Sequence, residues 1–247
     1  MMVMNKRFIL FSLLILPFLA STQQTQTVQT SFSTKGVFLD ASAGLSLPVG
    51  AYAMSNEGNS QSGFSRNGLV VQLTCDWMGK KDFGLAFQYT FQLNPLKNAY
   101  KDSVLPGMSV PLGSGNWSNH YIMAGPVYLK YFKKFLFEAK VLVGVIISTS
   151  PLFKTVDPAY KTVSGNTGTG LAFGLGAGAG YKVSSNIALM INAEYLMGTP
   201  KIDRQYGAQI IGYRDSAFVY SAPVNFDTKK IVSSFNLGIS IIFKIPG

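Results

Sequence analysis

The sequence predicts an all-β protein, an eight-stranded antiparallel up-and-down transmembrane β-barrel. Apolar residues recur at every second position through eight separate segments, which is the periodicity of a β-strand with two different faces. Short and long connections alternate between these segments, and an even strand number with this alternation is typical of outer-membrane barrels. With 47% hydrophobic and only 13% charged residues, the 247-residue chain is too apolar to be disordered.

The first residues predict an export signal. Lys6 and Arg7 precede an apolar run from Phe8 to Ala20, and small or polar residues follow, as in a secretory signal peptide. The run is too short to cross a bilayer as a helix, which needs about 20 residues. We expect residues 1–22 to form the signal peptide, 23–35 a short periplasmic segment, and 36–247 the barrel domain.

The first three predicted strands show the alternation clearly. Residues 36–47 place valine, leucine and alanine opposite aspartate, serine and glycine. Residues 68–78 place leucine, valine and tryptophan on one face and glutamine and threonine on the other. Residues 83–93 place phenylalanine, tyrosine and leucine opposite glycine, alanine and glutamine. A short basic turn at Lys80 and Lys81 joins the second strand to the third, which predicts a hairpin.

The remaining five segments follow the same rule. Residues 119–132 and 135–147 form a predicted hairpin across Lys133 and Lys134. A second hairpin joins 170–182 to 187–197 through a polar turn of serine and asparagine, and 230–245 forms the last strand. Lipid favours closure of these strands into a barrel, because an open sheet edge would leave unpaired backbone groups in hydrocarbon.

Four long connections separate the hairpins: residues 48–67, 94–118, 148–169 and 198–228. Because short turns of such barrels face the periplasm, we expect these loops to be extracellular and both termini to be periplasmic. The fourth connection contains two apolar runs, AQIIGY and AFVYSA. They predict a hairpin above the membrane; the alternative is two further wall strands, which would make ten.

Two stretches carry a family resemblance. They are GLAFGLGAGAGYKVSSNIALMINAEYL, a glycine-rich strand followed by a strand ending in Glu-Tyr, and MAGPVYLKYFKKFLFEAKVLVGV with its basic turn. Both resemble the OmpA/OmpX-type outer-membrane β-barrel superfamily, and the likeness extends over about residues 36–245. The resemblance implies an eight-stranded outer-membrane barrel and implies no catalytic residue. Many such barrels end in an aromatic residue that the insertion machinery reads; this chain ends FKIPG, so Phe243 would take that part.

An eight-stranded barrel is only wide enough for its own side chains, so we expect a filled lumen and no open pore. Strand parity assigns seven charged residues to the lumen near the periplasmic end: Asp40, Asp76, Lys130, Glu138, Lys140, Lys182 and Lys244. Charges removed from water must be paired, so these residues predict a salt-bridge plug. A three-residue turn would make Lys130 and Glu138 direct cross-strand partners. The alternative is that these side chains extend to the membrane interface.

Glycine alternates along the lumen face of one predicted strand, from Gly174 to Gly180. A three-residue turn would place Gly176 opposite Glu194 and Gly178 opposite Asn192. Missing side chains on one strand would then make room for longer ones on the next. A phosphate-binding loop is excluded, since there is no GK[ST] and no helix follows.

Aromatic residues gather at the short-turn ends of the strands and predict an interfacial girdle: Trp77, Phe83, Tyr131, Phe135, Tyr181 and Phe243. The long loops and their rims carry the basic residues Arg66, Lys97, Lys101, Lys154, Lys161, Lys201, Arg204 and Arg214. These cations predict contacts with lipid or lipopolysaccharide phosphates. The alternative is an ordinary solvated loop surface.

The net charge of +10 would suit nucleic acid, but the export signal favours an anionic membrane surface instead. The single cysteine excludes a disulfide framework and a thiolate zinc cluster. We expect no cofactor. The only histidine, His120, lies two residues from Ser118, a pairing that some lipid-modifying outer-membrane enzymes use; parity directs His120 into the lumen, and no third residue is identified by spacing.

The sequence therefore predicts a non-enzymatic outer-membrane protein with a structural or surface-binding role, in which the loops bind an extracellular ligand. A small porin-like transporter of solutes or apolar molecules is the first alternative. A lipid A-modifying envelope enzyme is the second.

Overall fold

The structure is a computed structural model that describes residues 35–54, 63–79, 82–97, 113–153, 166–207, 210–214, 217–220 and 224–245. Side chains are described within a narrower set, which leaves out 113–114, 152–153 and 203–228. The described residues belong to one compact unit, Ser33–Gly247. The predicted signal peptide, and the periplasmic segment up to residue 34, lie outside the described residues.

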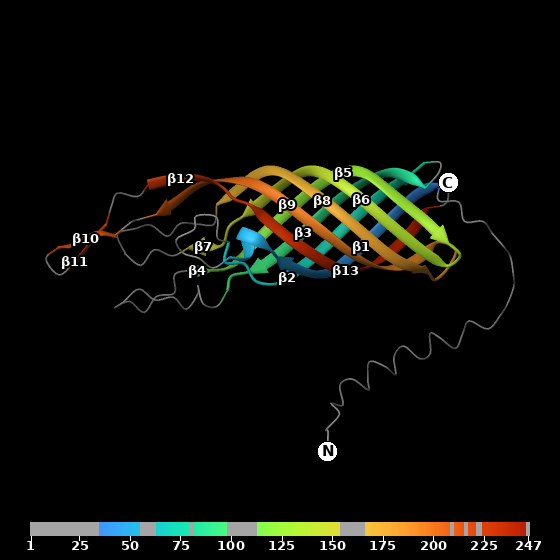
Figure 1. The fold of residues 1–247 in the computed structure, drawn as a ribbon, viewed down its shortest axis with the longest axis horizontal. Coiled ribbons are helices and arrows are strands. Elements are labelled where there is room, and N and C mark those ends of the chain that lie inside the picture. The colour runs from blue at the N-terminus through green and yellow to red at the C-terminus, as the bar shows by residue number, and fades with distance from the viewer. Residues whose placement is uncertain are drawn as a thin grey trace, which may run out of the picture. The chain divides into compact units, whose positions relative to one another are not determined.

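Eight strands form a closed antiparallel ring, as predicted. They are β1 (Gly36–Pro48), β2 (Gly68–Met78), β3 (Phe83–Pro95), β5 (Asn116–Phe132), β6 (Phe135–Thr149), β8 (Thr167–Lys182), β9 (Ile187–Gly207) and β13 (Val232–Ile245). Each strand pairs with its neighbour along the chain, and β13 pairs with β1 to close the wall. Figure 1 shows the strands tilted across a barrel. We call the end with the short connections the turn end and the other the loop end.

Shorter elements lie at the loop end. The turn η1 (Gly50–Ala53) follows β1, and β4 (Gly113–Ser114) pairs with β7 (Leu152–Phe153). The strand β12 (Val224–Lys229) extends the wall by pairing with the distal part of β9. The runs predicted as a hairpin form β10 (Ile210–Arg214) and β11 (Ala217–Tyr220), a separate two-stranded sheet. The ten-strand alternative is therefore wrong.

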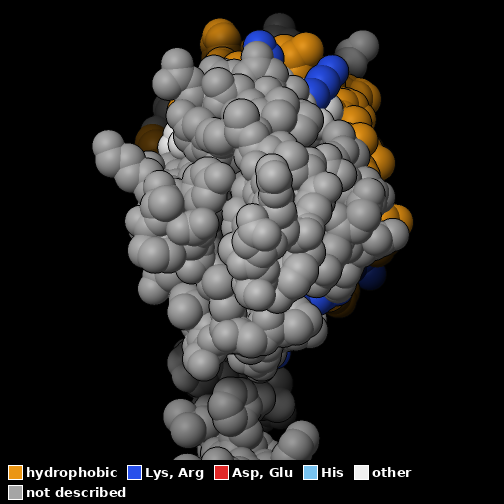
Figure 2. All heavy atoms as spheres, turned by 90° about the vertical axis from the view of Figure 1, so that its left-hand side faces the viewer, with side chains coloured by type: hydrophobic (Ala, Val, Ile, Leu, Met, Phe, Trp, Pro, Cys, Tyr) orange, Lys and Arg blue, Asp and Glu red, His pale blue; other side chains and the backbone are white. Residues whose placement is uncertain are grey.

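The outer face of the wall is apolar. Because successive side chains of a strand point to opposite faces, each wall strand sends every second residue outward. Large hydrophobic side chains are exposed around the ring; they include Leu69, Trp77, Phe83, Ile122, Val143, Leu171, Ile191 and Ile239. Figure 2, viewed from the loop end, shows hydrophobic side chains with a few Lys and Arg at the visible margin of the wall. Among the described residues, no helix is long and apolar enough to cross a membrane.

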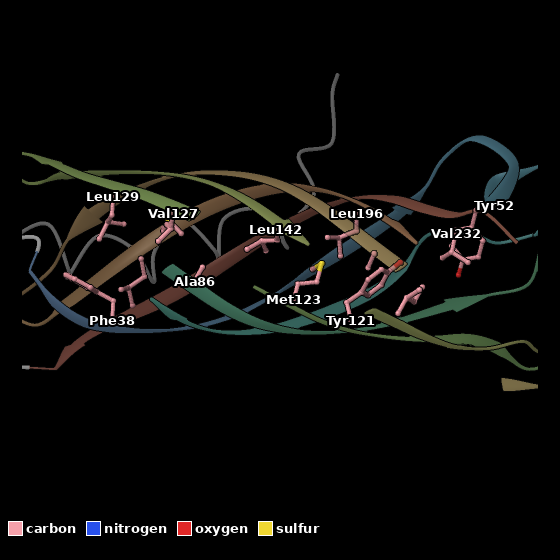
Figure 3. Packing of buried hydrophobic residues seen from close by; sticks show 14 of the residues in the cluster. Phe38, Tyr52, Ala86, Tyr121, Met123, Val127, Leu129, Leu142, Leu196 and Val232 are labelled. Carbon is pink, nitrogen blue, oxygen red and sulfur yellow. The ribbon is translucent and has the colours of Figure 1, made fainter. Parts of the chain in front are cut away.

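The inner face encloses a packed core. Figure 3 shows buried side chains along the inside of the barrel, from Phe38 and Leu129 near the turn end to Tyr52 and Val232 near the loop end. All four side chains are at most 1% exposed. The core of this protein is therefore the barrel lumen itself, as expected for eight strands.

One turn has a backbone conformation that lysine rarely adopts. The β5–β6 connection consists of Lys133 and Lys134 alone, and Lys133 has a φ of 58°. Glycine is the usual residue at positive φ in two-residue hairpins, because it has no Cβ to clash with the neighbouring carbonyl. Lysine occupies this position although glycine would suit the backbone better.

Candidate functional site

A cluster of buried charges crosses the lumen, and it is built on four adjoining or facing strands. The Lys140 Nζ lies 3.3 Å from Glu138 Oε1 on the same strand, and both side chains are 4% exposed or less. Lys140 also interacts electrostatically with three further buried carboxylates: Asp40, Asp76 and Glu194. Lys140–Glu138 is the single ion pair within the described part of the chain. The arrangement thus sets four carboxyl groups around one ammonium.

Glutamine amides complete the surroundings of Glu194. Gln88 Nε2 donates hydrogen bonds to both Glu194 carboxylate oxygens, at 2.8 and 3.1 Å, and Gln72 Nε2 also donates to this carboxylate. The register sets Glu194 opposite Gly176, where an added Cβ would lie 2.9 Å from the Lys140 side chain. Glycine on β8 therefore leaves the space that Lys140 occupies. Gly178 lies opposite Asn192, which is also buried.

The prediction that Lys130 belongs to this cluster is wrong. On β5 the lumen-facing residues nearest to Lys130 are Val127, Leu129 and Tyr131, so Lys130 points outward and is exposed. The two-residue turn makes Phe137 the cross-strand partner of Lys130, so Lys130 does not face Glu138. From Met123 to Leu129 the buried, lumen-facing side chains of this strand are apolar, so the expectation that polar residues face inward fails there.

The same alternation along β5 shows that one residue of the predicted aromatic girdle, Tyr131, does not belong to it. Tyr131 points inward and packs on the core, with its ring centroid 6.5 Å from that of Phe38. The outward aromatic residues of β5 are Tyr128 and Phe132, and the Tyr128 ring lies 4.9 Å from that of Phe83. Trp77, Phe83, Phe135, Tyr181 and Phe243 are all exposed on the outer face near the turn end.

Two of the predicted lumen lysines lie at the mouth of the barrel, away from the acids. Lys182 and Lys244 are on inward-facing positions at the ends of β8 and β13 and are half-buried. The Lys244 Nζ lies 5.8 Å from the centroid of the Phe38 ring. The salt-bridge plug of three acids and four bases is thus corrected to four acids and one base, because Glu194 joins the cluster and three lysines leave it.

The loop end of the lumen is closed by side chains that sequence reasoning had assigned to loops. Tyr52 from η1 is buried, and its ring meets that of Trp117 edge-on at 5.6 Å. Asn119 Nδ2 donates to the Tyr52 hydroxyl at 2.9 Å, and this hydroxyl donates to Asn94 Oδ1 at 3.4 Å. Burial raises the pKa of Tyr52, so the hydroxyl stays protonated and can donate.

The Trp117 indole fixes the returning first loop. Its Nε1 donates to the Gly63 carbonyl at 2.8 Å. No periodic signal marks Tyr52 or Trp117, because one lies in a turn and the other at a strand end. Their aromatic character within otherwise polar loop sequence is the only clue that they are buried.

His120 is on the outer face, so the prediction that it points into the lumen is wrong. Its Nδ1 lies 2.8 Å from the Tyr89 hydroxyl and its Nε2 lies 3.3 Å from Ser118 Oγ. Its ring also packs at 4.9 Å from Phe91. The described carboxylates of the wall strands point into the lumen, so none of them orients this imidazole as an acyl-transfer triad requires.

The predicted loop cations are only partly placed. Arg66 and Lys201 are exposed at the loop end, whereas the Lys97 ammonium donates to the Ala53 carbonyl and so ties β3 to η1. The side chains of Arg204 and Arg214 are not described, and Lys101, Lys154 and Lys161 lie outside the described residues. No group of three or more His, Cys, Asp or Glu within the described residues is placed to hold a metal ion.

Fold and surface together define a class: a closed, up-and-down eight-stranded β-barrel with an apolar exterior and a filled interior. No family model and no curated protein matches the sequence. Solved structures with a similar fold include Neisserial surface protein A, which is 14% identical with a TM-score of 0.49, over 85% of this chain and 98% of that one.

Two further solved structures are similar. OprG from Pseudomonas aeruginosa is 13% identical over 85% of this chain and 97% of its own, with a TM-score of 0.48. Ail, the attachment invasion locus protein of Yersinia pestis, is 14% identical over 85% of this chain and 99% of its own, with a TM-score of 0.44. At these identities the likeness concerns the fold.

Proposed function

We propose that the chain is an exported, integral outer-membrane protein whose barrel is a closed scaffold and whose long loops bind at the cell surface. The observation that carries this proposal is the filled lumen. Buried side chains occupy it from Phe38 at the turn end, through the Lys140 cluster, to Tyr52 and Trp117 at the loop end. A barrel filled in this way would leave the loops as the part able to bind.

The apolar outer face supports placement in a bilayer. A contiguous exposed apolar surface of this extent is costly in water and favourable in lipid. The short turns then face the periplasm and the loop end faces outside, where Arg66 and Lys201 are positioned to contact lipopolysaccharide phosphates. The signal peptide in residues 1–22 and the barrel-insertion machinery would bring the chain there.

The two tryptophans allow a direct test of the membrane placement. We expect brominated lipid to quench the emission of Trp77, which is 64% exposed on the outer face, and to leave Trp117, which is 1% exposed, almost unquenched. The measurement uses the Trp117→Phe and Trp77→Phe variants of the full chain reconstituted into vesicles. Equal quenching of both variants would contradict the proposed outer face.

The closed lumen is tested by conductance. We expect no unitary current steps from the purified protein in a planar bilayer in concentrated KCl, because buried side chains fill the described part of the lumen. Steady wild-type steps would favour the porin-like alternative. In parallel, cells displaying the barrel should adhere to a surface coated with the polyanion heparin, which suits the exposed cations Arg66 and Lys201, and a variant lacking residues 98–112 and 154–165 should adhere less. Equal adherence of cells with the wild type and cells with this variant would contradict the proposed binding role of the loops.

A further inference from the structure

The turn end of the barrel carries a group of lysines on its outer rim. Lys130, Lys133 and Lys134 are all exposed, and they lie on the β5–β6 hairpin. We name these three residues the rim lysines. None of them takes part in the ion pair of the described residues, which joins Lys140 to Glu138 in the lumen. Their charge is therefore directed to the surroundings of the barrel.

Aromatic side chains fix the depth at which the rim lysines lie. The Lys133 ammonium lies 5.9 Å from the centroid of the Phe132 ring, and the Lys134 ammonium lies 6.0 Å from that of Tyr181. Phe132 and Tyr181 are exposed on the outer face, together with Phe135. Exposed aromatic rings of a membrane barrel sit at the interface between hydrocarbon and headgroups. The ammonium groups beside them are then at headgroup level.

Two inward-facing lysines add positive charge at the mouth of the barrel beside this rim. The Lys182 N–H donates to the Lys134 carbonyl at 2.8 Å, so the end of β8 lies against the hairpin turn. Lys182 and Lys244 interact electrostatically with each other at the adjoining mouth. The carboxylates described on the wall strands are in the lumen, and the remaining described one, Asp82, lies in the β2–β3 turn, where its carbonyl accepts the Leu129 N–H at 2.9 Å beside Lys130. On the other side of the hairpin, from β6 to β13, the described side chains at this end present cations without an intervening acid.

We propose that the rim lysines bind the phosphodiester headgroups of anionic phospholipids in the periplasmic leaflet. An ammonium group donates charge-assisted hydrogen bonds to phosphate oxygens, and lysines close to an anionic membrane surface gain affinity from it. The flanking rings of Phe132, Phe135 and Tyr181 contact the upper acyl chains and hold the headgroup beside the lysines. Glycine would suit the backbone of this turn better than Lys133 does, but it would remove one of the three charges.

The inference rests on the proposed membrane placement, and it is tested by lipid retention. Full-length protein is reconstituted in nanodiscs of phosphatidylethanolamine with one quarter phosphatidylglycerol, and lipids kept after detergent extraction are identified by native mass spectrometry. We expect the wild type to retain phosphatidylglycerol at least three-fold above its share in the bilayer. The Lys130→Gln, Lys133→Gln, Lys134→Gln variant should lose this enrichment, and the corresponding arginine variant should keep it.

A matched variant controls for net charge. Lys229→Gln removes one positive charge from the loop end, at a residue with no proposed phosphate contact, and it should retain phosphatidylglycerol as the wild type does; Lys133→Gln removes one from the rim and should lower the enrichment. Unchanged enrichment in the rim variant, or equal loss in Lys133→Gln and Lys229→Gln, overturns the proposal. A rim variant that keeps its lipid but no longer sediments with isolated peptidoglycan would assign the lysines to the cell wall instead.

Insertion is checked separately, by the shift between unboiled and boiled protein on an SDS gel. If the barrel inserts but shows no phosphatidylglycerol enrichment, only the proposed headgroup site is contradicted. If the chain never inserts, the proposed function and the headgroup site are both contradicted.

Discussion

Replacing Lys140 by methionine is expected to lower the free energy of unfolding by about 3–5 kcal/mol, the cost of breaking a buried ion pair by removing one partner. Methionine has a similar length, so the packing against Gly176 is largely kept. The loss is electrostatic, because the substitution removes the one ammonium among four buried carboxyl groups. Urea unfolding in vesicles, followed by tryptophan fluorescence and by the SDS gel shift, measures the change.

Lys130→Met provides the control for this prediction. Lys130 lies on the adjoining strand, is exposed and takes part in no described ion pair, so we expect a change within about 0.5 kcal/mol. If the two methionine variants unfolded at the same urea concentration, the lumen cluster would have no stabilising role.

Adding one methyl group at Gly44 is expected to destabilise the barrel by about 3 kcal/mol or more, at the upper end of the cost of overpacking. Gly44 faces Gly238 across the pairing of β1 with β13. A Cβ at this position would lie 2.0 Å from the Leu237 carbonyl oxygen and 2.6 Å from the Gly238 Cα. Both are backbone atoms, so relief requires the two strands to separate.

Gly174→Ala makes the same chemical change elsewhere on the lumen face. Its nearest neighbour would be a Leu196 methyl group at 3.0 Å, which can move by rotation of the side chain. We expect a cost below about 1 kcal/mol. The fraction of each variant that reaches the compact form on an unboiled SDS gel, and its urea midpoint, compare the two. A Gly44→Ala barrel as stable as the Gly174→Ala barrel would show that the wall tolerates this separation.

The strands were predictable because every second residue of a wall strand is apolar and faces outward. The predicted 68–78 strand is identical to the observed one, and the prediction of 83–93 ends two residues before β3 does. Strand ends at the loop side were placed short, as for β5, which begins at Asn116 and was predicted from residue 119. Toward the loop end, apolar and polar residues no longer alternate regularly along the strands.

The lumen was less predictable than the wall. Parity places Asp40, Asp76 and Glu138 inside because their neighbours along the strand are clearly apolar. On β5 both faces mix types: His120 and Lys130 face outward while Tyr121 and Leu129 face inward. Polarity cannot fix the orientation of such a strand, since a filled lumen accepts apolar residues. Tyr52 and Trp117 were missed because their burial depends on a turn folding back over the mouth.

The pairing of β1 with β13 also constrains how the molecule forms. It joins Val37 to Ile245, so the wall cannot close until nearly the whole chain has been delivered. Three hairpins with short connections can form early from local contacts, but this last contact has the largest sequence separation and is therefore slow. Until then β1 and β13 each present an unpaired edge, which readily pairs with other chains. A factor that shields these two edges until the wall closes would protect the protein at its most aggregation-prone stage.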